Sequence, residues 1–376
     1  MSERPTPHQQ TRHVYVHVPF CGRRCSYCDF SIAVRKDVPA AEFSTSVVAE
    51  LQHRIRPGEL ANVDTLYFGG GTPSKLGPAG VAGLIAGLKS AGVGLTDGAE
   101  VTLEANPEDL SGEAVSAWLE AGVNRLSLGV QSFAAEALTW MHRTHDAGQA
   151  VQAVRTARSA GLSNVSIDLI YAIPDRISRS WADDLTKAID LAPDHLSVYG
   201  LTVEPRTPLG KWTARGTEIA KDDDRSADEF LEASSRLRGA GFEHYEVSSY
   251  AQPGRRSRHN SAYWRRVPYL GLGPSAHSFD GTTRRWNTSA LAAWEQQLAA
   301  GTDPTGGSEV LSDAQRAEEE LYLALRTDGG ATLSGANLET ARRWVRAGWA
   351  VESGGVVKLT PEGWLRLDAL VGLLRS

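Results

Sequence analysis

The three cysteines of this chain all lie in one short segment, as Cys21, Cys25 and Cys28. No other cysteine occurs in the 376 residues, so the thiolates serve a single purpose. A cubane [4Fe–4S] cluster usually takes four cysteine ligands, and a set of three leaves one iron open to a small molecule. The C-x3-C-x2-C spacing therefore predicts a cluster with an exchangeable position.

Two other uses of the cysteines stay open at this point. A structural zinc site needs only three thiolates and one histidine, and His17 lies nearby. Such closed zinc sites usually draw on two separated ligand pairs, however, and the sequence has no second pair. Three neighbouring thiols also suit metal capture better than a disulfide framework. The cluster is therefore the preferred interpretation.

The composition is that of an ordinary globular protein, with 41% hydrophobic and 22% charged residues. A net charge of −6 provides no general attraction to nucleic acid or to an anionic membrane. The N-terminus does not resemble a signal peptide, and no apolar run approaches the length of a membrane span. We therefore expect a soluble, cytoplasmic protein in a reducing compartment, where iron–sulfur clusters persist.

Short β-rich runs alternate with amphipathic helical stretches over residues 1–200. This alternation predicts an α/β fold with a parallel sheet and right-handed crossovers. A complete eight-unit barrel would need two more such strands, so we predict a partial (β/α)6 TIM-like barrel. The expected strands are His13–Val18, Val63–Phe68, Glu100–Glu104, Arg125–Gly129, Val165–Ile170 and His195–Gly200. The expected helices between them are Ala40–Arg56, Gly77–Ser90, Gly112–Ala121, Gly148–Ala160 and Ser180–Leu191.

The alternation of strand-like and helix-like runs ends after residue 250. We expect a barrel domain over 1–250, a connecting loop over 251–290 and a smaller, mainly helical domain over 291–376. Within the last part, the hairpin-like run Val351–Leu359 beside helical stretches resembles a winged-helix segment. Basic residues are few there, which favours a packing or lid module over a DNA-binding one.

Polar or glycine-rich residues follow each expected strand, where ligands bind in parallel sheets and barrels. The cysteine segment follows the first strand, and a Gly-Gly-Gly-Thr-Pro turn over 69–73 follows the second. Later strand ends bring Glu104, Gln131 and Asp168, and Arg143 lies between the fourth and fifth strands. Each of these could be a helix cap or a surface charge. Together they indicate a polar ring around the mouth that holds the cysteines.

These motifs resemble the radical S-adenosylmethionine (SAM) superfamily, in which SAM chelates the open iron and is cleaved to a 5′-deoxyadenosyl radical. A narrower resemblance, to the oxygen-independent coproporphyrinogen III oxidase group, covers nearly the whole chain. That resemblance implies SAM contacts from Tyr15, Gly70, Gly71, Thr72, Glu104, Gln131, Arg143 and Asp168.

Two departures separate the chain from the true oxidase. Phe30 stands where the oxidase motif has a further cysteine, and Cys21 lies close to the start, where the oxidase has an extension. Both features, with a His-Asn-x-x-Tyr-Trp element, are instead similar to the haem-chaperone branch called HemW. That resemblance implies haem binding and transfer to acceptor haemoproteins. Its implied haem contacts are His259, Asn260, Tyr263 and Trp264, with His259 as the candidate axial ligand.

The residues alone leave alternatives open, both for the role of this segment and for the function of the protein. A solvated basic loop with a packed Tyr-Trp corner accounts for the 251–290 segment equally well. Its arginines are candidate partners for haem propionates: Arg255, Arg256, Arg258, Arg265 and Arg266. Coproporphyrinogen III oxidation is the alternative activity, disfavoured by the incomplete motif. A winged-helix redox regulator is a third, disfavoured by the acidic charge. A homodimer is compatible with the sequence.

Overall fold

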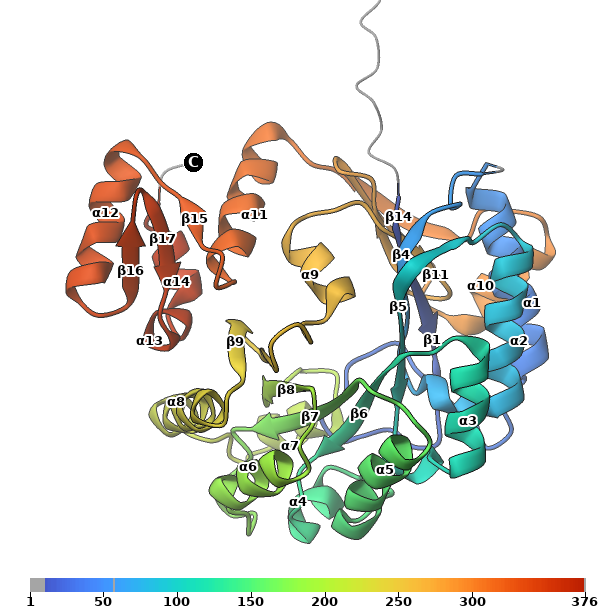
Figure 1. Ribbon diagram of the computed structural model, residues 1–376, viewed down its shortest axis with the longest axis horizontal. Coiled ribbons are helices and arrows are strands. Elements are labelled where there is room, and N and C mark those ends of the chain that lie inside the picture. The colour runs from blue at the N-terminus through green and yellow to red at the C-terminus, as the bar shows by residue number, and fades with distance from the viewer. Residues whose placement is uncertain (1–10, 57, 375–376) are drawn as a thin grey trace, which may run out of the picture.

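The computed structural model describes residues 11–56 and 58–374, and its main body is a nine-stranded sheet that follows an open arc (Figure 1). The strand order is β11-β1-β4-β5-β6-β7-β8-β10-β9, with β11 to β8 parallel and the last two antiparallel. Their bounds are β1 (His13–Val18), β4 (Val63–Gly70), β5 (Leu95–Ala105), β6 (Arg125–Gln131), β7 (Val165–Tyr171), β8 (His195–Gly200), β9 (Glu243–Glu246), β10 (Ser249–Ala251) and β11 (Leu270–Leu272). The predicted partial barrel is confirmed, with all six expected strands in order.

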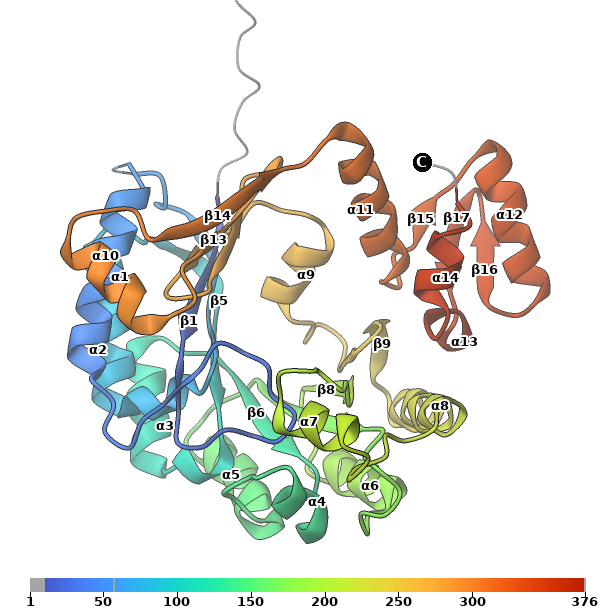
Figure 2. The ribbon, with the colours of Figure 1, turned by 180° about the vertical axis from the view of Figure 1, so that it is seen from behind.

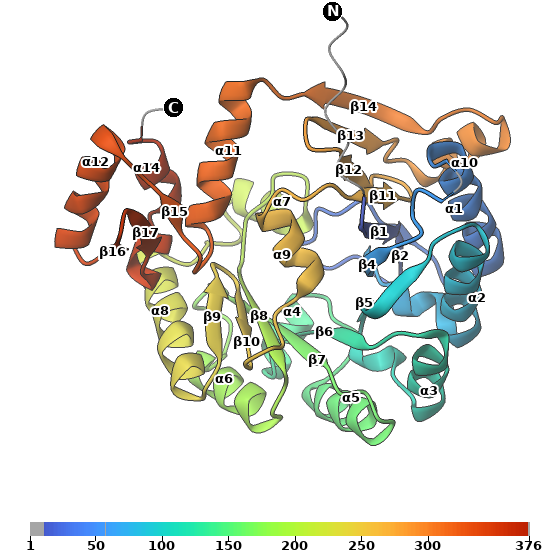
Figure 3. The same ribbon diagram turned by 45° about the horizontal axis from the view of Figure 1, so that its top comes forward.

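Helices cover the convex side of this sheet because alternate strand residues are apolar (Figure 3). In β1, for example, Val14, Val16 and Val18 are fully buried in the main core, whereas Tyr15 and His17 belong to the opposite face. The covering helices are α1 (Ala40–Arg54), α2 (Gly77–Ser90), α3 (Gly112–Ala121), α5 (Ala147–Ser159), α6 (Trp181–Asp190) and α8 (Asp223–Gly239). The short helices α4 (Ala135–Trp140) and α7 (Pro208–Ala214) share a separate apolar cluster with Tyr27. No described helix is long and apolar enough to cross a membrane.

The segment 251–290, expected as a connecting loop, instead belongs structurally to the barrel. Its strand β11 pairs in parallel with β1 and extends the sheet. Its helix α9 (Arg258–Trp264) lies on the concave side of the sheet (Figure 3). The strands β12 (His277–Phe279) and β13 (Thr283–Asn287) form a separate sheet with β14 (Thr305–Val310). These elements have three to seven residues, too few for a periodic pattern to show.

The small C-terminal domain has its own apolar core, beside the barrel (Figure 2). Trp294 and Leu298 of α10 (Leu291–Ala299) pack into the main core, whereas Leu325 of α11 (Asp313–Leu325) packs into the second. The boundary therefore lies between these helices and not at residue 291. An antiparallel sheet contains the expected hairpin, with α12 to α14 around it: β15 (Ala331–Thr332), β16 (Ala350–Ser353), β17 (Val356–Leu359), α12 (Gly335–Arg346), α13 (Pro361–Trp364) and α14 (Leu367–Val371).

A buried carboxylate, Glu50 on α1, fastens the segment after β11 to the barrel. It accepts hydrogen bonds from the Gly273 backbone N–H at 2.8 Å, from Asn287 Nδ2 at 2.7 Å and from Trp294 Nε1 at 2.9 Å. Its Oε1 also pairs with Arg54 Nε at 3.0 Å. One side chain thus connects α1 with β13, α10 and the β11 turn.

We expect Glu50→Ala to lower the free energy of unfolding by about 3–5 kcal/mol, because it removes the nearer carboxylate partner of the buried Arg54 and leaves only the exposed Asp303, at 3.5 Å. Three further donors would lose their acceptor. Chemical denaturation followed by circular dichroism measures the effect. The matched control is Gln52→Ala on the exposed face of the same helix, where a change within about 0.5 kcal/mol is expected. Equal stability of the two variants would contradict this role of Glu50.

Candidate functional site

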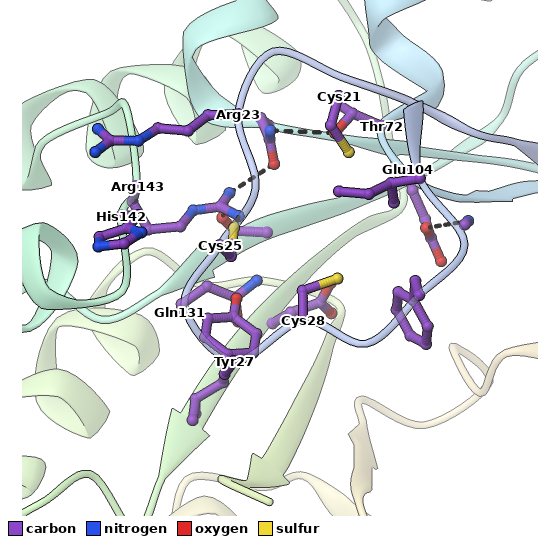
Figure 4. A pocket seen from close by; sticks show the side chains of 18 of the residues that line it. Cys21, Arg23, Cys25, Tyr27, Cys28, Thr72, Glu104, Gln131, His142 and Arg143 are labelled. Carbon is purple, nitrogen blue, oxygen red and sulfur yellow. Dashed lines mark hydrogen bonds between the residues drawn. The ribbon is translucent and has the colours of Figure 1, made fainter. Parts of the chain in front are cut away.

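The cysteine segment, residues 21–28, crosses the carboxyl ends of the strands (Figure 4). Hydrogen bonds near its middle fix its position. The Ser26 N–H donates to the Met141 carbonyl at 3.1 Å, and the Leu209 N–H donates to the Ser26 carbonyl at 2.8 Å. The Tyr27 side chain packs against the apolar cluster that includes Met141 and Leu209. Backbone and side chain together therefore hold the cysteines over the barrel.

All three cysteines are free thiols that line one cavity of about 560 Å³. Desolvation raises the pKa of Cys28 to about 11, so without a metal this thiol is protonated at neutral pH. Among the described residues, no three His, Cys, Asp or Glu side chains are placed to hold a single metal ion. Three sulfurs around one roomy cavity, with the Arg143 guanidinium 3.5 Å from Cys25 Sγ, fit a larger, anionic group. Cys21, Cys25 and Cys28 would hold a [4Fe–4S] cluster there.

Glu104, at the end of β5, is the principal carboxylate of the cavity. Its Oε1 accepts from the Tyr67 hydroxyl at 2.7 Å, and its Oε2 accepts from the Gly70 N–H at 3.1 Å. Desolvation raises its pKa to about 7, and the neighbouring Asp168 also acts to raise it. The side chain is therefore poised to ionise when a positively charged group or an N–H donor enters the cavity.

The glycine turn after β4 packs tightly against the chain that leads into the cysteine segment. Gly70 has φ +107°, and a Cβ there would lie 2.5 Å from the His17 ring. A Cβ on Gly71 would lie 2.7 Å from the Pro19 carbonyl carbon. The close approach of two chain segments thus requires glycine at both positions, and the left-handed backbone is a second reason at Gly70. Thr72, next in the turn, lies 3.4 Å from Cys21 Sγ through its hydroxyl.

Arg143 bridges several strand ends within the cavity. It donates to Asn106 Oδ1 at 2.6 Å and to the Gly129 carbonyl at 2.7 Å, and its buried Nε has no hydrogen-bond partner. A buried donor without a partner is available to an anionic ligand group. Asn106 was not among the predicted contacts, although it follows Glu104 at the same strand end.

Asp168 and Gln131 lie on the neighbouring strands β7 and β6. The Ser127 hydroxyl donates to Asp168 Oδ1 at 3.1 Å. Desolvation raises the pKa of Asp168, with hydrogen bonds from Ser197 and Ser127 opposing the shift. Gln131 has φ +69°, an uncommon conformation for a residue with a side chain and one that often occurs at functional sites.

Seven of the eight residues implied as SAM contacts line this cavity, and Tyr15 does not. The Tyr15 hydroxyl lies 3.1 Å from His17 Nδ1, and its ring stacks on Tyr67. It therefore packs beside Glu104 and the glycine turn without lining the cavity. Cavity residues that the sequence reasoning missed include Arg23, Asn106, Ser127, His142 and Tyr199. Asn106 directly follows β5 and Tyr199 is next to last in β8, and this position at strand ends is the signal that could have found them.

The structure buries the His259 side chain, the expected axial ligand, to 1% exposure. Its Nδ1 lies 2.7 Å from Thr65 Oγ1, and its Nε2 lies 2.8 Å from the Tyr263 hydroxyl. Both ring nitrogens therefore have partners, and neither is free for an iron. Trp264 packs against the Arg326 guanidinium, which lies 4.3 Å from the ring centre, and Asn260 does not line the cysteine cavity.

The arginines around α9 are largely engaged by the protein itself. Arg256 pairs with Glu243 and Asp328, and Arg266 pairs with Glu319. The pairs with Asp328 and Glu319 connect the flanks of α9 to the C-terminal part of the chain, and the pair with Glu243 connects them to β9. The element that resembles a haem site thus makes many of its contacts within the protein, and its haem contacts stay a prediction.

The matches to known proteins agree with this geometry. The family model of the radical SAM superfamily matches residues 15–188. A protein of Mycobacterium tuberculosis named heme chaperone HemW is 37% identical over 371 residues, covering 96% of this chain and 94% of the relative. This chain belongs to the HemW family. HemW of Escherichia coli is 37% identical over 265 residues, or 70% of this chain and 69% of that protein.

The chain therefore has the radical SAM scaffold, and that family implies an iron–sulfur cluster and SAM as cofactors. A bovine relative, radical S-adenosyl methionine domain-containing protein 1, mitochondrial, is 36% identical over 87% of this chain and 76% of its own length. The solved structure of coproporphyrinogen III oxidase (HemN) from Escherichia coli superimposes with a TM-score of 0.82 at 22% identity, over 97% of this chain and 90% of that one. At that identity the likeness shows a shared fold.

Proposed function

We propose that this protein is a haem chaperone that binds haem and passes it to acceptor haemoproteins. One observation carries the proposal: the three cysteines line one cavity with seven of the expected SAM contacts, and Phe30, not a further cysteine, stands two residues after Cys28. The name heme chaperone on two relatives, which are aligned over 94% and 78% of their own lengths, supports it.

Within this proposal, the cysteines hold the [4Fe–4S] cluster and the polar ring holds SAM. Glu104 would accept hydrogen bonds from the SAM amino group, and Arg143 would pair with its carboxylate. Gln131 and Asp168 would bind the ribose hydroxyls. The bound group supplies one-electron chemistry at the open iron. The protein residues orient SAM and surround it with desolvated polar groups.

The proposal is tested by haem titration of the anaerobically reconstituted protein, followed at the Soret band, and then by transfer to an apo-haemoprotein such as apomyoglobin. We expect saturable binding of about one haem per chain and transfer faster than from free haem in detergent. Failure to bind haem would overturn the proposal. Formation of protoporphyrinogen IX from coproporphyrinogen III, above a Cys25→Ser control, would instead establish the oxidase activity.

A further inference from the structure

The cysteine cavity also contains the exposed aromatic rings of the described chain. Phe30 is 60% exposed and Tyr199 is 44% exposed, and no other Phe, Tyr or Trp in residues 11–56 and 58–374 is open to a similar degree. Both line the cavity. Aromatic side chains normally bury most of their large apolar surface. Two open rings in one cavity therefore indicate a flat, apolar ligand.

Neither ring belongs to the polar set assigned to SAM. Tyr199 stands two residues after Ser197 on β8, so both belong to the barrel-interior face of the strand. Desolvation and the Asp168 carboxylate raise the pKa of Tyr199, so its phenol is neutral at physiological pH. A neutral phenol offers its ring face to a ligand and is a poor ligand for iron. Phe30 can offer only its ring.

We propose that this cavity binds haem through stacking of the porphyrin face on Phe30 and Tyr199, with no axial ligand from His259. This inference rests on the proposed haem-chaperone function and gives it a site. Stacked aromatic rings hold a planar group without a bond to its iron. The iron therefore stays free to take a ligand from the acceptor, which suits a protein that must release its haem.

The site is tested by haem titration of four variants, each reconstituted and checked for equal iron and sulfide content. Phe30→Ala and Tyr199→Ala each remove a ring and should weaken haem binding about two- to tenfold. Tyr199→Phe keeps the ring and should bind as the wild type does. Ile219→Ala is the matched control, because Ile219 is 80% exposed and does not line the cavity.

Iron-free protoporphyrin IX separates stacking from iron coordination. A stacking site should bind it within about threefold of haem, because the porphyrin face is the same. SAM affinity, measured on the same variants by calorimetry, should stay within about twofold of the wild type. This second measurement distinguishes a haem contact from a contact to the adenine of SAM.

Each other result has a distinct meaning. If the wild type binds haem and the alanine variants bind it equally well, this site is wrong and the chaperone function stands. Loss of binding for iron-free porphyrin overturns the stacking mode in favour of an axial ligand, for which His142 is the histidine that lines the cavity. Weaker SAM binding with unchanged haem binding assigns the rings to SAM and overturns the inference. Absence of haem binding in the wild type removes the chaperone function itself.

Discussion

Cys25→Ser is expected to abolish the cluster, lowering iron and sulfide from about four of each per chain to below about one after anaerobic reconstitution. The reason is that the chain has three cysteines and no spare thiolate to replace the one removed. Serine is a poor substitute for a thiolate on iron. SAM binding should weaken as well, because the open iron is one of its anchors. Iron and sulfide assays with electronic absorption spectra measure the loss.

The control for this variant lies next to it in the segment. Ser26 is fully buried, and its Oγ has no hydrogen-bond partner in the described structure, so Ser26→Ala removes no side-chain hydrogen bond. This variant should keep the full cluster. Circular dichroism should show the same fold in both proteins, since the barrel core does not include Cys25. A Cys25→Ser protein with full iron and sulfide, or a wild type that contains zinc, would contradict the cluster assignment.

The barrel could be predicted from the sequence because its strands are long and buried. Strands such as β1 and β8 match their predicted bounds, since each is a run rich in Val, Leu or Tyr that ends at Pro19 or at Gly200. The site followed from the same pattern, because carboxyl ends of parallel strands meet at one edge. Glu104, Gln131 and Asp168 therefore come together as expected.

The other features of the fold and of the site depend on tertiary contacts, which a local sequence pattern does not reveal. The strand β11 has three residues and exists because β1 offers it an edge and Glu50 holds the turn that follows. The family resemblance implies His259 as the candidate axial ligand, whereas in the structure Thr65 and Tyr263 lie within hydrogen-bond distance of its two ring nitrogens. Tyr15 precedes the cysteines by six positions but stacks on Tyr67 beside the cavity. Burial of a polar side chain is decided by its tertiary partners.

Glu104→Gln is expected to weaken SAM binding about 10- to 100-fold, because a carboxylate accepts charge-assisted hydrogen bonds that a neutral amide does not match. The change keeps the size of the side chain and an acceptor for the Tyr67 hydroxyl or the Gly70 N–H. Calorimetry on the reconstituted variant measures the affinity, with iron and sulfide content shown to be unchanged. Glu113→Gln, on the exposed first turn of α3, is the control and should bind SAM normally.

The same carboxylate predicts a pH dependence of SAM affinity. Desolvation raises the pKa of Glu104 to about 7, so at pH 6 roughly one tenth of the free protein carries the ionised side chain. SAM favours that ionised form, and its affinity should therefore rise with pH, by a factor on the order of ten between about pH 6 and pH 7.5. Measurements should stop there, because a free α-amino group itself titrates near pH 7.7–8.0. Glu104→Gln should flatten this rise, whereas parallel profiles in the two proteins would show that another group controls it.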